Sequence, residues 1–325
     1  MKEKVVVTGA AGFIGSHLCE RLLDEGHEVL GVDSFTDYYS PERKRLHLAA
    51  CIARPGFTLA EGDLTTCDIA RLIKGARGVF HLAAQAGVRR SWGKEFALYI
   101  ESNILATQRL LEALKDLPGV PLVHSSSSSV YGETRTLPMR EDHPKVPLSP
   151  YGATKLSAEH LCELYRLNYG VKYRALRYFT VYGPRQRPDM AFSRFITAGF
   201  AAGAIEIYGN GKQTRDFTYV TDAVEANVRA YRYDGPHTVF NIGGGSRVSI
   251  LDVLGVMERE LGSRLDLRFG ERAKGDVTDT WADTELARDA LGFAPRVDLS
   301  EGIRREIAWY REYLGTAEGR RCHHD

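Results

Sequence analysis

The sequence places a phenol and an ammonium one helical turn apart, at Tyr151 and Lys155 in the segment Tyr-Gly-Ala-Thr-Lys. Residues four apart share a helix face, so both side chains point the same way. A free tyrosine has a pKa of about 10 and is a poor base near neutrality. We expect a nearby ammonium to favour the phenolate and to lower that pKa. Such a tyrosine can take a hydroxyl proton from a substrate.

A run of serines from Ser125 to Ser129 precedes this pair in the chain. Proton transfer from a substrate hydroxyl also needs a hydrogen-bonding group that fixes the substrate oxygen, and we assign that role to Ser127. The spacing of Tyr151 and Lys155 alone is typical of any amphipathic helix. The serine run and a glycine-rich segment near the N-terminus therefore favour a catalytic interpretation of Tyr151 and Lys155.

The glycine-rich segment contains Gly9, Gly12 and Gly15, directly after the apolar run Val5–Val7. One glycine permits a tight turn, another lets the backbone approach a phosphate, and the third allows close packing of helix on strand. A helix that starts near Phe13 would point its positive end at a pyrophosphate. The segment therefore predicts a dinucleotide site.

Asp33 ends the next predicted strand, about 20 residues further on, where a carboxylate binds a ribose diol. It would also repel a 2′-phosphate, which favours NAD over NADP. Oxidised nicotinamide would add a second positive charge favouring the phenolate. Arg43 and Lys44 leave this choice of cofactor open. They either contact a phosphate or form a solvated helix face. Asp63 follows the third predicted strand, where it either meets the adenine or builds a turn.

Short apolar runs alternate with amphipathic stretches through residue 180, which predicts a Rossmann-type, doubly wound parallel sheet covered on both faces. We expect an NAD-binding domain of residues 1–180 plus about 217–245. A smaller α/β substrate domain of residues 181–216 and 246–314 would follow, with a tail of 315–325. The predicted strands are Val5–Thr8, Glu28–Val32, Phe57–Ala60, Gly78–His81, Leu122–Ser126, Tyr173–Arg177, Ile205–Tyr208, Val239–Ile242 and Leu265–Arg268. The predicted helices are Ser16–Glu25, Pro41–Ala50, Ile69–Ile73, Phe96–Leu117 and Tyr151–Asn168, with others near 221–233, 249–261 and 300–314.

Composition excludes several classes of protein. The chain has 325 residues and a formal net charge of +1, so it is not a general polyanion binder, and we expect no nucleic-acid partner. It lacks an apolar run of about 18 residues, so we expect no membrane span. The five cysteines are odd in number and none has C-x-x-C spacing, which favours reduced thiols in the cytoplasm and no metal site.

At this point the chain resembles the extended short-chain dehydrogenase/reductase family, specifically its nucleotide-sugar branch and, within it, the UDP-glucuronate 4-epimerases. The resemblance runs from Val5 to about Leu314. The motifs that carry it are Asn103, Arg177-Tyr178-Phe179, Gly209-Asn210-Gly211, Arg215-Asp216-Phe217, Val220-Thr221-Asp222, Ala83–Arg89, Ser126–Tyr131, Phe179–Pro184 and Arg187–Ala191. It implies an isomerase that oxidises sugar carbon 4, rotates the keto sugar and returns hydride to its other face.

The residues before Val130-Tyr131-Gly132 separate members of this branch. Related dehydratases carry an Asp-Glu pair where this chain has Ser128 and Ser129, and related decarboxylases carry Glu in place of Ser129. UDP-galactose 4-epimerases usually have Asn where this chain has Thr180. The three hydroxyls are candidates to hold a substrate carboxylate. The alternative is that the serines cap backbone groups of their own loop.

The resemblance and the residue chemistry together give the full predicted site. The catalytic residues are Ser127, Tyr151 and Lys155. The cofactor residues are Gly9, Gly12, Phe13, Ile14, Gly15, Asp33, Asp63, Leu64, Leu82, Ala83, Ala84, Asn103, Tyr151, Lys155 and Tyr178. The substrate residues are Gln85, Arg89, Ser127, Ser128, Ser129, Thr180, Arg185, Arg187, Arg215, Arg272 and Asp276.

Several of these assignments keep an alternative. The arginines suit a diphosphate because guanidinium donates bidentately, but surface arginines are usually only solvated. Phe192 or Phe195 would cover the uracil or belong to the core. Other UDP-sugars, UDP-glucose or a UDP-N-acetylhexosamine, are alternative substrates, and a non-catalytic NAD-sensing protein is an alternative function. The resemblance also implies a homodimer through the helices near 96–117 and 151–168.

Overall fold

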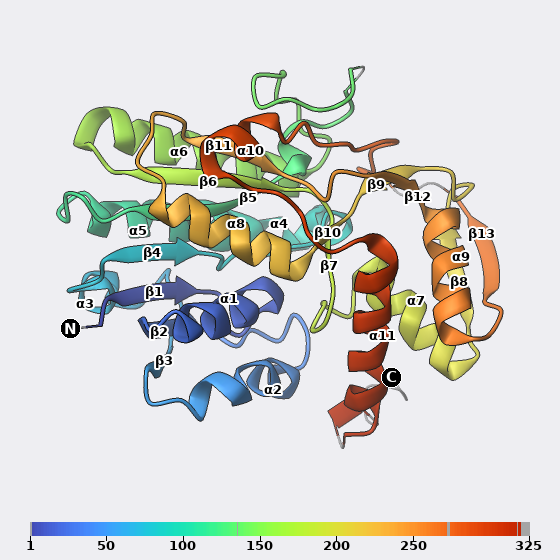
Figure 1. Ribbon diagram of the computed structural model, residues 1–325. Coiled ribbons are helices and arrows are strands. Elements are labelled where there is room, and N and C mark those ends of the chain that lie inside the picture. The colour runs from blue at the N-terminus through green and yellow to red at the C-terminus, as the bar shows by residue number, and fades with distance from the viewer. Residues whose placement is uncertain (1, 135, 272–273, 317, 320–325) are drawn as a thin grey trace.

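A seven-stranded parallel sheet forms the centre of the molecule (Figure 1). The computed structural model describes residues 2–134, 136–271, 274–316 and 318–319. The strand order is β11-β6-β5-β4-β1-β2-β3, so the order in which strands are added reverses between the parallel neighbours β1 and β4, where ligands bind in such sheets. The predicted fold class is confirmed. The strands are β1 Lys4–Thr8, β2 Glu28–Asp33, β3 Phe57–Glu61, β4 Gly78–His81, β5 Leu122–Ser127, β6 Tyr173–Tyr178 and β11 Val239–Ile242.

Alternate side chains of β1 enter two separate cores, one on each face of the sheet. Val5 and Val7 pack with α1 and α8, whereas Val6 packs with α5 and α6. This follows from the two-residue period of a strand, and all three valines are buried because both faces are covered. The helices of this part are α1 Phe13–Asp24, α2 Pro41–Ile52, α3 Ile69–Ile73, α6 Pro150–Tyr169 and α8 Val220–Arg232.

The helix that we predicted over 96–117 is not continuous. It is divided into α4 Phe96–Tyr99, a π-helical segment Ile100–Leu105 and α5 Ala106–Leu114. A π-helical turn is wider than an α-helical one and often marks a functional position. Here it carries Asn103, whose buried side chain hydrogen-bonds two neighbouring segments. The periodicity of the sequence contains no signal for this turn.

The rest of the described chain builds short sheets and three helices beside the C-terminal ends of the central strands, and a fourth helix, α10, which packs against β11 and α8 (Figure 1). Strand pairs are β7 Val181–Tyr182 with β10 Thr218–Tyr219, β9 Thr214–Asp216 with β12 Arg247–Ser249, and β8 Ala204–Tyr208 with β13 Asp266–Gly270. The helices are α7 Ala191–Ala201, α9 Ile250–Leu261, α10 Glu285–Leu291 and α11 Leu299–Leu314. Three short 3-10 helices are Arg89–Ser91, Gly93–Glu95 and Ser128–Val130.

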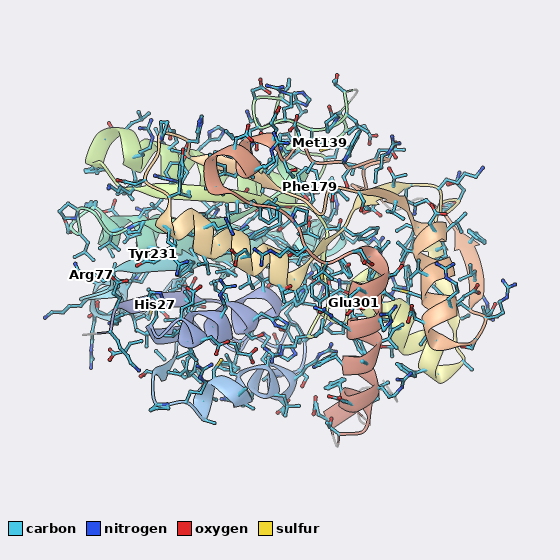
Figure 2. The ribbon with its side chains drawn as sticks, in the orientation of Figure 1. His27, Arg77, Met139, Phe179, Tyr231 and Glu301 are labelled. Carbon is cyan, nitrogen blue, oxygen red and sulfur yellow. The ribbon has the colours of Figure 1, made fainter. Side chains whose placement is uncertain are left out.

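A small third core supports the loop that follows β5. Met139 and Phe179, labelled in Figure 2, pack with Val130, Tyr131 and Ala282. The side chains of Met139 and Val130 are fully buried. The cluster thereby fixes the residues directly after Ser127. Within the described residues, no helix combines the length and the apolar character needed to cross a bilayer.

Candidate active site

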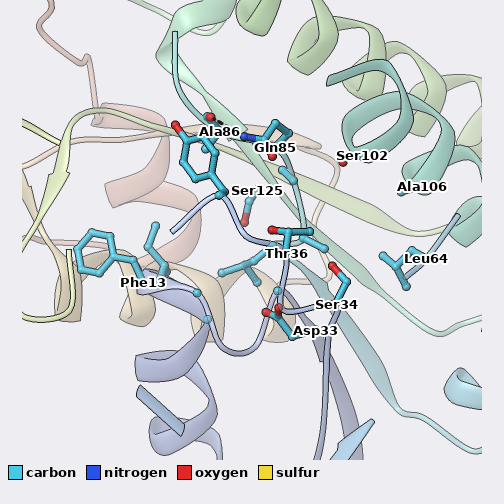
Figure 3. A pocket seen from close by; sticks show the side chains of 18 of the residues that line it. Phe13, Asp33, Ser34, Thr36, Leu64, Gln85, Ala86, Ser102, Ala106 and Ser125 are labelled. Atoms are coloured by element: carbon cyan, nitrogen blue, oxygen red, sulfur yellow. Dashed lines mark hydrogen bonds between the residues drawn. The ribbon is translucent and has the colours of Figure 1, made fainter. Parts of the chain in front are cut away.

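A pocket opens where the central strands end, and Figure 3 looks into it. Every predicted cofactor residue except Asn103 lines this pocket, as do Gln85 and Arg187 of the predicted substrate set. The predicted catalytic pair, Tyr151 and Lys155, shares its wall. Lining residues that the sequence analysis did not name as site residues are Val32, Ser34, Thr36, Tyr38, Tyr39, Lys44, Gly62, Ala86, Ser102, Ala106, Ser125 and Ser126.

The glycine turn fits a dinucleotide because side chains have no room in it. Gly9 has φ +69°, and a Cβ there would lie 2.7 Å from the backbone nitrogen of Ala83. A Cβ on Gly15 would lie 2.1 Å from the carbonyl oxygen of Gly9. The loop therefore presents bare backbone at the start of α1, which is the arrangement that binds a pyrophosphate.

Asp33 stands at the pocket edge with its carboxylate fixed by backbone amides. Ala11 N donates to Oδ2 at 2.9 Å, and Phe35 N donates to Oδ1 at 2.9 Å. Figure 3 shows Asp33 beside Ser34 and Thr36. An orientation held from two sides suits the recognition of a ribose diol, so the geometry agrees with a cofactor that lacks a 2′-phosphate.

The interpretation of Arg43 and Lys44 as a solvated helix face is wrong. Both side chains are buried, and α11 and the loop at Gln186 cover Arg43. Lys44 Nζ donates to the Thr36 carbonyl at 2.5 Å and lines the pocket. Burial lowers the pKa of Lys44, and the nearby charge of Asp33 opposes that shift. Arg43 instead donates to the Gln186 carbonyl at 2.7 Å.

Asp63 takes one of the two roles that the sequence left open. Its Oδ1 accepts hydrogen bonds from the backbone nitrogen and the hydroxyl of Thr65, each at 2.7 Å, so it builds a turn. The same residue lines the pocket next to Leu64, which is buried. A contact with adenine stays a prediction.

The phenol of Tyr151 hydrogen-bonds Ser127, the residue predicted to fix the substrate oxygen. Our expectation of a lowered pKa is not met: burial raises the pKa of Tyr151, while the Ser127 hydrogen bond and the charge of Arg187 act in the opposite direction. The opposing cation is thus Arg187, which is remote in sequence. Desolvation of the phenol outweighs these two opposing effects.

Lys155 is 4% exposed and lies on the same face of α6 as Tyr151. Burial lowers the pKa of Lys155 to about 8, against the opposing effect of Glu159. Asn103 holds this part of the helix in place, since its Nδ2 donates to Thr154 Oγ1 at 2.9 Å and its Oδ1 accepts from Gln85 N at 2.7 Å. Asn103 therefore positions the site without lining the pocket.

The hydroxyls of Ser128, Ser129 and Thr180 are all half-buried. None of the three makes a side-chain hydrogen bond to another described residue, so each remains able to bind a ligand. The cap that we considered for these serines is made by Ser127 instead, whose Oγ accepts from Ser129 N at 3.1 Å. A role for the three hydroxyls in substrate binding stays a prediction.

The structure separates the predicted diphosphate arginines. Arg187 lines the pocket and forms a bidentate ion pair with Asp189 at 2.9 and 3.0 Å. Arg185 has φ +68° and pairs with Glu20 of α1 at 2.6 Å. Arg185 therefore holds its loop on α1.

The remaining charged candidates that the structure describes, Arg89, Arg215 and Asp276, are not among the residues that line the pocket. Arg215 donates to the carbonyl oxygens of Val277 and Thr278 at 2.8 and 3.0 Å. Arg89 and Asp276 form an ion pair of 3.0 Å. Arg272 lies outside the described residues. Binding of a diphosphate by these groups stays a prediction.

Phe192 and Phe195 belong to the core, as the simpler of the two interpretations held. Both are buried, and the Phe192 ring lies 5.1 Å from the ring of Tyr182 and 4.9 Å from that of Phe217. Tyr38 and Tyr39 were overlooked as pocket residues. Two adjacent tyrosines directly after a strand that ends in Asp33 were the available signal.

Comparison with known proteins gives consistent matches over the chain. Residues 5–243 match the model of the NAD dependent epimerase/dehydratase family. An uncharacterized UDP-glucose epimerase of Bacillus subtilis is 43% identical over 94% of this chain and 97% of its own length. A UDP-glucuronate 4-epimerase of Thermodesulfobacterium geofontis is 38% identical over 95% and 96%. The crystal structure of a UDP-glucuronic acid 4-epimerase from Bacillus cereus, in complex with UDP-glucuronic acid and NAD, has a TM-score of 0.92 at 42% identity, covering 95% of this chain and 99% of that one.

Proposed function

Because the chain belongs to the NAD dependent epimerase/dehydratase family, we propose that it is a UDP-glucuronate 4-epimerase, converting UDP-glucuronate to UDP-galacturonate through a transient 4-keto sugar. The observation that carries this proposal is the grouping of Ser127, Tyr151 and Lys155 beside a dinucleotide pocket, with Ser128 and Ser129 directly following Ser127. A protein that only senses NAD has no use for a phenol in the pocket wall that is paired with a serine.

Each catalytic side chain has one task in this reaction. NAD, when bound, accepts the hydride of sugar carbon 4 and returns it. Ser127 donates a hydrogen bond to the oxygen on that carbon, and Tyr151 takes the hydroxyl proton and later gives it back. Lys155 places a positive charge at the pocket wall, one helical turn from Tyr151. The epimers differ only in the face to which hydride returns, so no acid–base residue beyond Tyr151 is required.

The direct test is incubation of the purified protein with UDP-glucuronate, followed by separation of epimer, UDP-pentose and keto sugar. Formation of UDP-galacturonate without net consumption of NAD is expected. Parallel incubations with UDP-glucose and UDP-N-acetylglucosamine test the alternative that the name of the Bacillus subtilis relative raises. Turnover of only a neutral sugar would replace the proposed substrate.

The uronic acid substrate can undergo decarboxylation as a side reaction, which the site must prevent. A 4-keto uronic acid is a β-keto acid and loses carbon dioxide when its carboxylate bond aligns with the carbonyl π system. We propose that Ser128, Ser129 and Thr180 hold the carboxylate out of that alignment. Support comes from their position after Ser127 and after β6, and from hydroxyls that the described chain leaves without hydrogen bonds.

Thr180→Val and Ser129→Ala are expected to change the product as well as the rate. A lost hydrogen bond to a charged group costs roughly 1.5–3 kcal/mol, about ten- to a hundredfold in affinity. UDP-glucuronate binding should weaken selectively over UDP-glucose binding, and UDP-pentose should appear at full conversion. Thr221→Val, at an exposed position of α8, is the matched control. If both variants keep wild-type affinity for UDP-glucuronate and release no carbon dioxide, these hydroxyls do not hold the carboxylate.

We also propose that two copies pair through the surface from α4 to α6. Large apolar side chains are exposed there, among them Ile100, Leu105, Leu164 and Leu167. Two α-helical faces of this kind from each subunit would bury one another as a four-helix interface. The proposal is supported by exposure alone, because apolar patches on this scale commonly mark contact surfaces.

Leu167→Glu is expected to give a monomer, because Leu167 is 64% exposed and the substitution would bury a charge in the interface. Sedimentation equilibrium measures the outcome. Leu46→Glu on α2, where Leu46 is 46% exposed, is the matched control and should leave the mass unchanged. A dimer that survives Leu167→Glu would place the contact elsewhere.

The division of the chain and its compartment complete the proposal. We propose that residues 1–180 and about 217–245 form the NAD-binding domain, with 181–216 and 246–314 as the sugar domain. β11 supports this, since it returns to the central sheet beside β6.

A cytoplasmic location is supported by Cys19, Cys51, Cys67 and Cys162, which are free thiols.

A further inference from the structure

The face of α6 that carries Tyr151 and Lys155 continues one turn further to Glu159. The three residues are spaced by four, so their side chains lie above one another. Lys155 and Glu159 are 4% and 5% exposed. A buried carboxylate requires partners, because desolvation of an unpaired charge is strongly unfavourable. The partners of Glu159 therefore define what it does.

Glu159 is held from two strands of the central sheet. Arg177 of β6 donates to Oε1 from Nε at 3.0 Å and to Oε2 from its terminal nitrogen at 2.7 Å. Ser126 of β5, the neighbour of Ser127, donates its hydroxyl to Oε1. A bidentate ion pair with an additional hydroxyl donor fixes both carboxylate oxygens. The carboxylate consequently cannot rotate away from the helix face that it shares with Lys155.

The other titratable groups around Lys155 provide no negative charge. His81 of β4 and His124 of β5 face it, and burial, followed by the charge of Lys155, lowers the pKa of both imidazoles. Cys162 lies on the same helix, and burial raises the pKa of its thiol. All three groups are therefore neutral near pH 7. Among these neighbours, Glu159 supplies the negative charge that opposes the desolvation of Lys155.

We propose that Glu159, fixed by Arg177 and Ser126, is a positioning residue that keeps the buried ammonium of Lys155 charged at the floor of the active site. The inference rests on the proposed function for its catalytic meaning, since Lys155 acts there through its charge. Arg177 carries the charge opposite to that of Glu159 and is bound to it, so the acidity of the ammonium should depend on both members of the pair.

This balance predicts opposite effects of two substitutions. Glu159→Gln removes the attraction and leaves the Arg177 charge, so Lys155 should lose its proton at a pH lower by about one unit or more, a tenfold change in the proton equilibrium. Arg177→Met exposes Lys155 to the full carboxylate, so Lys155 should lose its proton at a higher pH. The double variant should lie between Glu159→Gln and the wild type.

The measurement is a pH titration of the holoenzyme with isotope-labelled lysine, followed by NMR. The Lys155 resonance is identified by its absence from Lys155→Met. The alkaline limb of turnover with UDP-glucuronate should move in the same direction as the NMR midpoint in each variant. Glu306→Gln is the control, because Glu306 is another buried carboxylate but lies in α11, away from Lys155.

A purely structural role for the ion pair would lower stability and turnover without moving the two midpoints in opposite directions. Midpoints that stay at the wild-type value, or that move the same way in Glu159→Gln and Arg177→Met, overturn the proposal. If one variant does not fold, the sign of the shift in the other decides. The NMR titration requires no turnover, so it separates a failure of this inference from a failure of the epimerase assignment.

Discussion

Tyr151→Phe is expected to reduce turnover of UDP-glucuronate by roughly 100- to 10,000-fold, the range that a positioned general base contributes. The substitution removes the one atom that takes the hydroxyl proton and keeps the ring that lines the pocket. NAD and substrate binding should therefore stay close to wild type. Single-turnover kinetics and nucleotide extracted from the denatured protein measure the two effects separately.

The matched control for this prediction is Tyr169→Phe, on the same helix. Tyr169 is 58% exposed and lies at the end of α6, so removal of its hydroxyl should leave turnover unchanged. Near wild-type rates in Tyr151→Phe would reject Tyr151 as the base. Extracted nucleotide dominated by NADP would instead overturn the role of Asp33, because a carboxylate at that position repels a 2′-phosphate.

The sequence was sufficient for the residues whose role depends on the local chain. Gly9 and Gly15 were predictable because the turn and the helix start are encoded within a few residues, and the structure shows that a Cβ at either would clash with backbone. The position of Tyr151 and Lys155 on one helix face was predictable from their spacing, although their catalytic role stays a prediction that also drew on the serine run and the glycine-rich segment. The parallel sheet was predictable as well, because strands that are buried on both faces, such as β1, are continuous apolar runs rich in Val.

The sequence was insufficient wherever a distant segment decides the environment. Arg43 and Lys44 read as a solvated face, but both are buried, and α11, more than 250 residues further on, covers Arg43. The π-helical turn at Asn103 depends on contacts with Gln85 and Thr154 rather than on periodicity. Our prediction of the direction of the Tyr151 pKa shift was wrong for a related reason, because burial is a property of the whole fold.

Lys155→Met is expected to lose both rate and NAD affinity, because Lys155 lines the cofactor pocket together with Tyr151 and the charge proposed for it serves both the phenol and the cofactor. The folded protein should survive the substitution, since Glu159 keeps its ion pair with Arg177. Titration calorimetry with NAD and turnover with UDP-glucuronate measure the two losses. Lys172→Met, at an exposed residue, is the control. Unchanged NAD affinity would limit Lys155 to tuning the phenol.

The same variant should be more stable than the wild type at neutral pH, when both are compared without nucleotide. Lys155 has a folded-state pKa of about 8, against an ordinary value of 10.5, so the unfolded chain binds this proton more tightly. The penalty is fully present below pH 8, about 3 kcal/mol, and it fades as pH rises towards 10.5. Denaturant unfolding should therefore show a gap between the two proteins that closes on the alkaline side. A difference in unfolding free energy that does not change with pH would mean that the Lys155 ammonium is not desolvated in the fold. Glu159 would then not be needed to keep that ammonium charged.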